Sequence, residues 1–195
     1  MAPDDAVARA PRSDRRRALV AAAFRRIAEE GFEGLRTRDV AADVGVNIAT
    51  LHYYFPTKEA LIRAVVGHAM SRFASTLSAE GTPAQQLRAH FAGLRRLVRT
   101  EPQLMAVMGE LALRSTRDPA LAAILRQGDD AWHAWLLRLL VPAAKDGALP
   151  AGRNPSDVAA LVMATLRGLY MLPPESRNPK RGEQALRELE RSLGI

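Results

Sequence analysis

The sequence contains no cysteine among its 195 residues, and only 5% of its residues are aromatic. Without thiols, the chain can form neither disulfide bonds nor cysteine-ligated metal sites. The absence of cysteine is consistent with a reducing compartment. No apolar run approaches the roughly 18 to 20 residues that a membrane-spanning helix needs. The first residues carry acids and no apolar segment, so we expect no signal peptide. These absences predict a cytoplasmic protein with no membrane partner.

The sequence also lacks the motifs of common enzyme and metal sites. Its four histidines have none of the paired spacings that hold a metal on one face of a helix. It has no Walker A loop, no G-x-G-x-x-G turn and no G-x-S-x-G elbow. Nothing in the sequence therefore supports catalysis, a metal or a cofactor, and we expect a protein that is not an enzyme.

Positive charge is in excess, but it is not concentrated in one part of the chain. The net charge is +7, which favours polyanionic partners. Residues 1–60 hold ten of the 28 basic and nine of the 21 acidic side chains, so most of the excess lies further on. Arg12 and the arginines at 15–17 form a local basic cluster after residues 1–11, which we expect to be disordered. This cluster either contacts DNA or is a solvated tail.

Apolar residues recur with helical spacing along the chain and nowhere alternate with period two. With 48% apolar residues, the chain can also bury a substantial core. The sequence therefore predicts an all-α fold with about nine helices. The expected ranges are about 14–30, 37–44, 48–55, 57–78, 83–99, 102–114, 119–140, 155–172 and 181–193. A loop is expected to begin at Pro142, because proline disfavours a helix interior.

The stretch at 37–58 predicts two short helices joined by a tight turn. Thr37 and Asn47 are residue types that cap helix N-termini. Gly45 between them suits the positive φ angle of a helix end. Pro56 ends the second helix after about two turns.

This second short helix combines an apolar face with polar and aromatic residues. Leu51 and Phe55 are four residues apart and form an inward face, which leaves His52, Tyr53 and Tyr54 directed outward. A helix of this size with such a surface fits the major groove of DNA. A helical hairpin in any all-α protein has the same pattern, so the pattern alone leaves both interpretations open.

A longer set of residues extends this pattern: Gly31, Phe32, Thr37, Val40, Ala41, Gly45, Val46, Thr50, Leu51, Tyr54, Phe55, Lys58, Glu59 and Leu61. Through these residues, the chain from about 14 to 66 resembles the TetR family of bacterial transcriptional regulators. Two positions depart from the family pattern: Ala49 stands where glycine is common, and His52 where tyrosine is common. Both lie on the presumed reading face, so the operator sequence cannot be transferred from a relative.

The resemblance implies a three-helix helix–turn–helix DNA-binding domain at 12–60 and a C-terminal helical domain at 61–195 for ligand binding and dimerisation. It implies a ligand-responsive repressor that binds a palindromic operator in double-stranded DNA as a homodimer and is released by a small-molecule inducer. The implied phosphate contacts are Thr37, Thr50, Tyr54 and Lys58. The implied base contacts are Ile48, Ala49, His52 and Tyr53, and Asn47 completes the predicted DNA-binding set.

The C-terminal part is rich in methionine and aromatic side chains, which line adaptable apolar pockets. The candidate ligand-binding residues are His90, Phe91, Met105, Met108, Trp132, Trp135, Met163 and Tyr170, with His133 or Arg114 as an alternative polar anchor to His90. An ordinary helical core has the same composition.

The last two helices offer apolar faces that suit a dimer interface. The candidate residues are Leu161, Thr165, Gly168, Leu169, Leu186, Leu189 and Leu193. Intramolecular packing alone is the alternative, and the dimer is favoured because one short reading helix recognises few bases and two-fold symmetry doubles the contact. A helical protein-interaction module is a further functional class, but it does not explain the outward face at 50–54.

Overall fold

The computed structural model describes residues 12–172 and 174–194, and in these the regular secondary structure is all helical, with nine α-helices and one short 3₁₀ helix. This confirms the predicted all-α class. The chain forms two compact units, divided between Ala69 and Met70. The expected disorder of residues 1–11 concerns residues outside the described part. None of the described helices is both long enough and apolar enough to cross a membrane.

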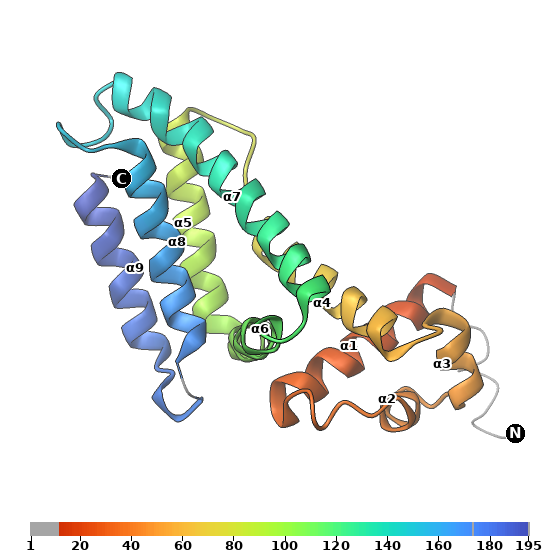
Figure 1. Ribbon diagram of the computed structural model, residues 1–195. Helices are drawn as coiled ribbons and strands as arrows, with labels where there is room; N and C mark the ends of the chain where they lie inside the picture. Colours follow the sequence, from red (N-terminus) through yellow and green to blue (C-terminus); the bar gives the residue numbers. More distant parts are fainter. Residues whose placement is uncertain (1–11, 173, 195) are drawn as a thin grey trace, which may run out of the picture. The chain divides into compact units, whose positions relative to one another are not determined.

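The first unit contains α1 (Arg12–Glu30), α2 (Thr37–Asp43), α3 (Ile48–Tyr54) and the beginning of α4 (Lys58–Ala74) (Figure 1). Helix α1 packs on α2, and α2 packs on α3. The predicted apolar stripe of α1 is buried, as are the inward residues of the next helices. The fully buried members include Leu19, Ala23, Ile27, Val40, Leu51, Leu61 and Val65.

Helices α1 and α2 are also joined by an ion pair. Arg26 donates from Nε to one carboxylate oxygen of Asp43 at 2.6 Å and from Nη2 to the other at 2.9 Å. Hydrogen bonding from this guanidinium holds the pKa of Asp43 below its ordinary value. A two-point contact of this kind restricts orientation as well as distance. It therefore sets the angle at which α2 crosses α1.

The second unit contains the end of α4 and helices α5 (Pro83–Thr100), α6 (Pro102–Ser115), α7 (Pro119–Lys145), α8 (Pro155–Met171) and α9 (Pro179–Leu193), with the 3₁₀ helix Pro174–Ser176 before α9. Helix α5 lies against α7 and α9, and α8 lies between α7 and α9 in the ribbon view (Figure 1). A core of buried residues joins these helices. Its members include Leu87, Phe91, Leu136, Leu140, Val162, Met163 and Leu189.

Two expected helix ends differ from the structure. Helix α7 continues through Pro142 to Lys145, although proline was expected to start a loop. Proline removes one intrahelical hydrogen bond, but Leu140 and Ala143 on either side are buried, and their packing keeps this turn helical. Helix α4 ends at Ala74 and not near 78, because the chain tightens into turns such as the bond from Leu77 N–H to the Ala74 carbonyl at 3.0 Å.

Candidate DNA-binding and ligand-binding sites

The turn between α2 and α3 is built as the sequence predicts. Gly45 has a φ angle of +69°, which a side chain would strain. Asn47 is the N-cap of α3, and its Oδ1 accepts hydrogen bonds from the Thr50 N–H at 2.8 Å and the Thr50 hydroxyl at 2.9 Å. The N-terminus of α3 is therefore stabilised by the residue directly before it in the sequence.

The predicted cap at Thr37 is wrong. Thr37 is the first residue of α2, and the N-cap position is occupied by Arg36, whose side chain makes no capping hydrogen bond. Arg36 has the extended backbone of a cap residue, with φ −107° and ψ 126°. The helix thus begins one position too early for Thr37 to be the N-cap, whose hydroxyl would accept a hydrogen bond from an amide of the first turn. Whether Thr37 contacts a phosphate stays a prediction.

Helix α3 divides into the two faces that its sequence predicts. Leu51 and Phe55 are buried, whereas Ala49, His52 and Tyr53 are exposed, and Tyr53 keeps 65% of its surface accessible. Asn47 is exposed as well, and the other members of the predicted DNA-binding set are half-buried at the helix ends and flanks: Thr37, Ile48, Thr50, Tyr54 and Lys58. The arrangement presents a short run of polar and aromatic groups on a rigid helix.

The start of α1 lies beside this helix. The Arg12 guanidinium lies 5.8 Å from the centre of the Tyr53 ring, and that of Arg16 lies 5.1 Å from the Phe55 ring. The rings of Tyr53 and Tyr54 meet edge to face, with centres 5.2 Å apart. Two arginines of the basic cluster therefore gather at α3, where they add positive charge beside its exposed face.

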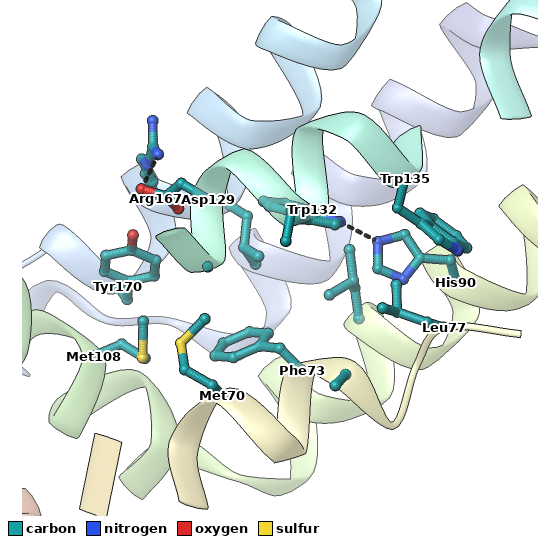
Figure 2. A pocket seen from close by; sticks show the side chains of 15 residues that line it. Met70, Phe73, Leu77, His90, Met108, Asp129, Trp132, Trp135, Arg167 and Tyr170 are labelled. Atoms are coloured by element: carbon teal, nitrogen blue, oxygen red, sulfur yellow. Dashed lines mark hydrogen bonds and ion pairs between the residues drawn. The ribbon is translucent and has the colours of Figure 1, made fainter. Parts of the chain in front are cut away.

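The second unit contains an apolar cavity of about 350 Å³, bounded by the end of α4 and by α5, α6, α7 and α8 (Figure 2). Five of the eight predicted ligand-binding residues line it: His90, Met108, Trp132, Trp135 and Tyr170. The volume falls in the range of small-molecule sites. The two tryptophans that line it are the only ones in the chain.

The other three predicted ligand-binding residues do not line this cavity. Phe91, Met105 and Met163 are buried, and Phe91 and Met163 belong to the helical core. Nor do the alternative anchors His133 and Arg114 line it. Their residue types suggested a ligand pocket, but each of them lies on a helix face that is directed at neighbouring helices.

Sequence reasoning missed other lining residues, chiefly Met70, Phe73, Leu77, Leu94, Asp129, Leu166 and Arg167. Helical spacing held a signal for four of them. Leu94 follows His90 by four residues, and Leu166 precedes Tyr170 by four. Asp129 precedes Trp132 by three residues, and Arg167 precedes Tyr170 by three, so each shares a face with a predicted residue. The α4 residues gave no such signal.

His90 is almost fully buried and uses both ring nitrogens. Trp132 Nε1–H donates to Nε2 at 3.0 Å, and Nδ1 lies 2.7 Å from the Thr76 hydroxyl, which itself donates to the Phe73 carbonyl at 2.7 Å. Burial lowers the pKa of His90 from 6.5 to about 4. The imidazole is therefore neutral at pH 7 and ties α5 to α7 and to the turn after α4.

Asp129, Arg167 and Tyr170 lie at the opposite end of the cavity from His90 and Trp135 (Figure 2). Asp129 of α7 forms a salt bridge with Arg167 of α8. Burial raises the pKa of the Tyr170 hydroxyl, which therefore stays protonated and can donate a hydrogen bond. This end can bind a polar group, whereas the rest of the cavity offers apolar and aromatic surface.

Comparison with known protein families identifies matches to two family models, which together cover most of the chain. Residues 83–193 match the C-terminal domain of BetI-type transcriptional repressors, and residues 19–65 match the bacterial regulatory proteins of the tetR family. The chain belongs to the TetR family of bacterial transcriptional regulators. The resemblance stated from the sequence is therefore confirmed, and the protein is a DNA-binding transcriptional regulator with a ligand-binding C-terminal domain.

Solved structures of other proteins share this fold, among them a TetR transcription regulator. A regulator from Haloarcula marismortui is 19% identical with a TM-score of 0.82, covering 93% of this chain and 97% of its own. AibR, solved with isovaleryl coenzyme A and operator DNA, is 20% identical with a TM-score of 0.71, covering 92% and 98%. A regulator from Saccharomonospora viridis, solved with choline, is 21% identical with a TM-score of 0.73, covering 92% and 97%. No curated protein sequence matches the chain significantly.

The predicted dimer residues of this TetR-family chain divide into two groups. Leu161 keeps 48% of its surface exposed, Gly168 is exposed, and Thr165 and Leu169 are half-buried on α8. The three leucines of α9 are instead buried within the protomer: Leu186, Leu189 and Leu193. Because α9 packs them against its own chain, chiefly α5, they are removed from the candidate interface.

Proposed function

We propose that this TetR-family regulator is a cytoplasmic repressor without catalytic activity. As a homodimer it binds a palindromic operator in double-stranded DNA through α3, and a small-molecule inducer in the cavity of the second unit releases it. The observation that carries the proposal is the build of α3. A capped, anchored helix holds His52 and Tyr53 outward, where their side chains can contact DNA.

The roles within this helix follow from position. Ile48 and Ala49 lie at the N-terminal end of α3, the end that meets base edges in helix–turn–helix proteins, and both can contact thymine methyl groups. His52 and Tyr53 add hydrogen-bonding groups on the exposed face. The implied phosphate contacts lie around this face: Thr37, Thr50, Tyr54 and Lys58. Asn47 acts chiefly by holding the helix start.

The dimer is proposed to form through the outer face of α8. Leu161, Thr165 and Gly168 are spaced three to four residues apart and lie on one side of the helix. Met171, the last residue of α8 and three residues after Gly168, is 55% exposed, and Leu172 just after the helix is 40% exposed. Apolar side chains exposed along one helix indicate an interface. Two-fold symmetry would present two copies of α3 to two half-sites, which doubles the bases that are read.

Release is proposed to pass through α4, which begins at Lys58 and ends at Ala74 beside the cavity. Met70, Phe73 and Leu77 line the cavity from this helix and the turn that follows it. A ligand that binds better to one orientation of α4 shifts the protein toward that orientation. Half-sites are separated by whole turns of DNA, so a small change in the spacing of the two α3 helices weakens binding. The complexes of AibR and of the Saccharomonospora viridis regulator show ligands in proteins of this fold.

Selection from a random duplex library tests the DNA-binding part. Purified protein is incubated with the library at low salt, and the retained duplexes are sequenced. We expect enrichment of an inverted repeat whose half-sites are one or more helical turns apart. Folded dimeric protein that enriches no sequence would contradict the proposed operator binding.

A further inference from the structure

A second cavity of about 260 Å³ adjoins the first. Five side chains line both cavities and so form the partition between them: Met70, Met108, Asp129, Arg167 and Tyr170. Beyond this partition, the smaller cavity is lined by two polar side chains, Ser115 and Arg126, and by four apolar ones. The larger cavity is therefore apolar and aromatic beyond the partition, whereas the smaller cavity has a basic side chain there.

We propose that the inducer is an elongated monoanion whose apolar body occupies the larger cavity and whose carboxylate lies between Arg126 and Arg167 in the smaller one. This inference rests on the ligand-binding part of the proposed function and names the chemical class of the ligand. It does not depend on which DNA sequence is bound.

The balance of charge across the two cavities supports an anion. Their charged lining groups are Asp129, Arg126 and Arg167, so one positive charge is left over after Asp129 pairs with Arg167. Arg126 takes part in none of the salt bridges within residues 12–172 and 174–194. His90 is neutral and has both nitrogens occupied, so it adds no charge at the far end. A ligand with one negative charge would balance the remaining positive charge.

Arg167 can bind a carboxylate without giving up Asp129. A guanidinium has five N–H donors in a planar fork, and the salt bridge to one carboxylate leaves donors on its other edge. The Arg167 side chain is 43% exposed and that of Asp129 37%, so neither is locked in a dry core. The protonated Tyr170 hydroxyl, which lies close to this pair in Figure 2, supplies a further donor.

The partition can open for an elongated molecule. Two of its five members are methionines, whose unbranched side chains change rotamer readily. Met70 lies against α7 at Gly128, where an added Cβ would be 2.7 Å from the methionine Cε. Glycine at 128 thus gives the Met70 side chain room at the junction. Rotation of Met70 or Met108 would join the cavities into one channel.

Intrinsic fluorescence gives a direct assay, because the chain's only two tryptophans both line the larger cavity. The wild-type dimer is titrated, without DNA, with octanoate, octan-1-ol and octyltrimethylammonium. These probes share one alkyl chain and differ in end-group charge. We expect octanoate to bind about tenfold tighter than octan-1-ol, the effect of one charge-assisted hydrogen-bond pair, and octyltrimethylammonium to bind weakest.

Two variants locate the anion site. In Arg126→Gln and Arg167→Gln, the affinity for octanoate should fall to that for octan-1-ol, whose own affinity should stay unchanged. Arg138→Gln, an exposed arginine of α7 that lines neither cavity, is the matched control and should keep the preference for octanoate. Thermal unfolding of each variant shows whether the fold is retained.

The outcomes separate the inference from the proposed function. Tighter binding of octyltrimethylammonium would mean that Asp129 and the aromatic rings bind a cation, and it would overturn the inference while leaving the regulator function intact. Equal binding of all three probes, or a preference for octanoate that survives both substitutions, would overturn it too. No binding of any probe by protein that still selects an inverted repeat would overturn the inference and leave operator binding in place.

Discussion

Trp132 donates its indole N–H to Nε2 of His90 at 3.0 Å, and this bond determines which imidazole nitrogen carries the proton. Since Nε2 must accept, the proton lies on Nδ1, which then donates to the Thr76 hydroxyl. Protonation of Nε2 would set two donors against each other. The neutral His90 therefore joins three segments around the cavity: α5, α7 and the turn after α4.

The first prediction concerns the pH dependence of stability. The pKa of His90 is about 4 in the folded protein, against 6.5 for an ordinary histidine. Between these values the unfolded chain binds more protons, so the contribution of His90 is complete above pH 6.5 and is lost as the pH falls toward 4. We expect the free energy of unfolding to fall by about 3 kcal/mol from this residue, measured by urea unfolding at several pH values.

Comparison with variants isolates this contribution from the carboxylates, which titrate in the same range. His90→Leu should be less stable at pH 7 and should lose less stability on acidification than wild type. His133→Gln, at a half-buried histidine outside the cavity, is the control and should keep the wild-type slope. A His90→Leu variant with the full wild-type slope would show that His90 does not titrate as described.

Lys58 is predicted to contact a phosphate. Its removal in Lys58→Ala should weaken binding to all duplexes by a similar factor, because the backbone carries no sequence information. The slope of log K against log salt should also become shallower by about one unit. Fluorescence anisotropy on operator and scrambled duplexes over a salt series measures both effects. An unchanged slope would remove Lys58 from the phosphate contacts.

Tyr53 is predicted to contact bases, so its removal should change sequence preference, which removal of the Lys58 phosphate contact should not do. Tyr53→Ala should change which sequences a random library yields, with a loss of discrimination of about 1–3 kcal/mol at the affected position. Tyr53→Phe separates the two parts of the side chain, because it keeps the ring beside Arg12 and removes only the hydroxyl: a changed preference in this variant assigns the contact to the hydroxyl, and an unchanged one to the ring. If Tyr53→Ala retained the wild-type preference, Tyr53 would belong to the surroundings of the site and not to the reading set.

The interface on α8 yields a prediction about assembly. Leu161→Glu should convert the dimer into a folded monomer and abolish tight binding to the inverted repeat, because a charge in an apolar interface is not compensated. Light scattering coupled to size exclusion measures the mass, and circular dichroism the helix content. Leu113→Glu is the matched control, since Leu113 of α6 is 62% exposed and lies outside the proposed interface. A dimeric Leu161→Glu protein would contradict the interface.

The helices and the turn at 44–47 could be predicted from the sequence because their causes are local. Helical periodicity, the positive φ of Gly45 and the cap at Asn47 act within a few residues, so their effect is visible in the sequence. The same reasoning failed at Thr37, where a shift of one position in the helix start removes the cap. It also failed at Pro142, where burial of Leu140 and Ala143 keeps the turn helical despite the proline.

The sequence by itself determined the class, the family and the outward face of α3, because these depend on residue type and spacing along the chain. Only the tertiary structure decided which apolar residues face a cavity and which face a core. Met108 lines the cavity whereas Met105, three residues earlier, is buried without lining it. In the same way, α9 buries its leucine line and α8 exposes Leu161. Which face of a helix is covered depends on the neighbours that pack on it, and long-range packing leaves no signal in local composition.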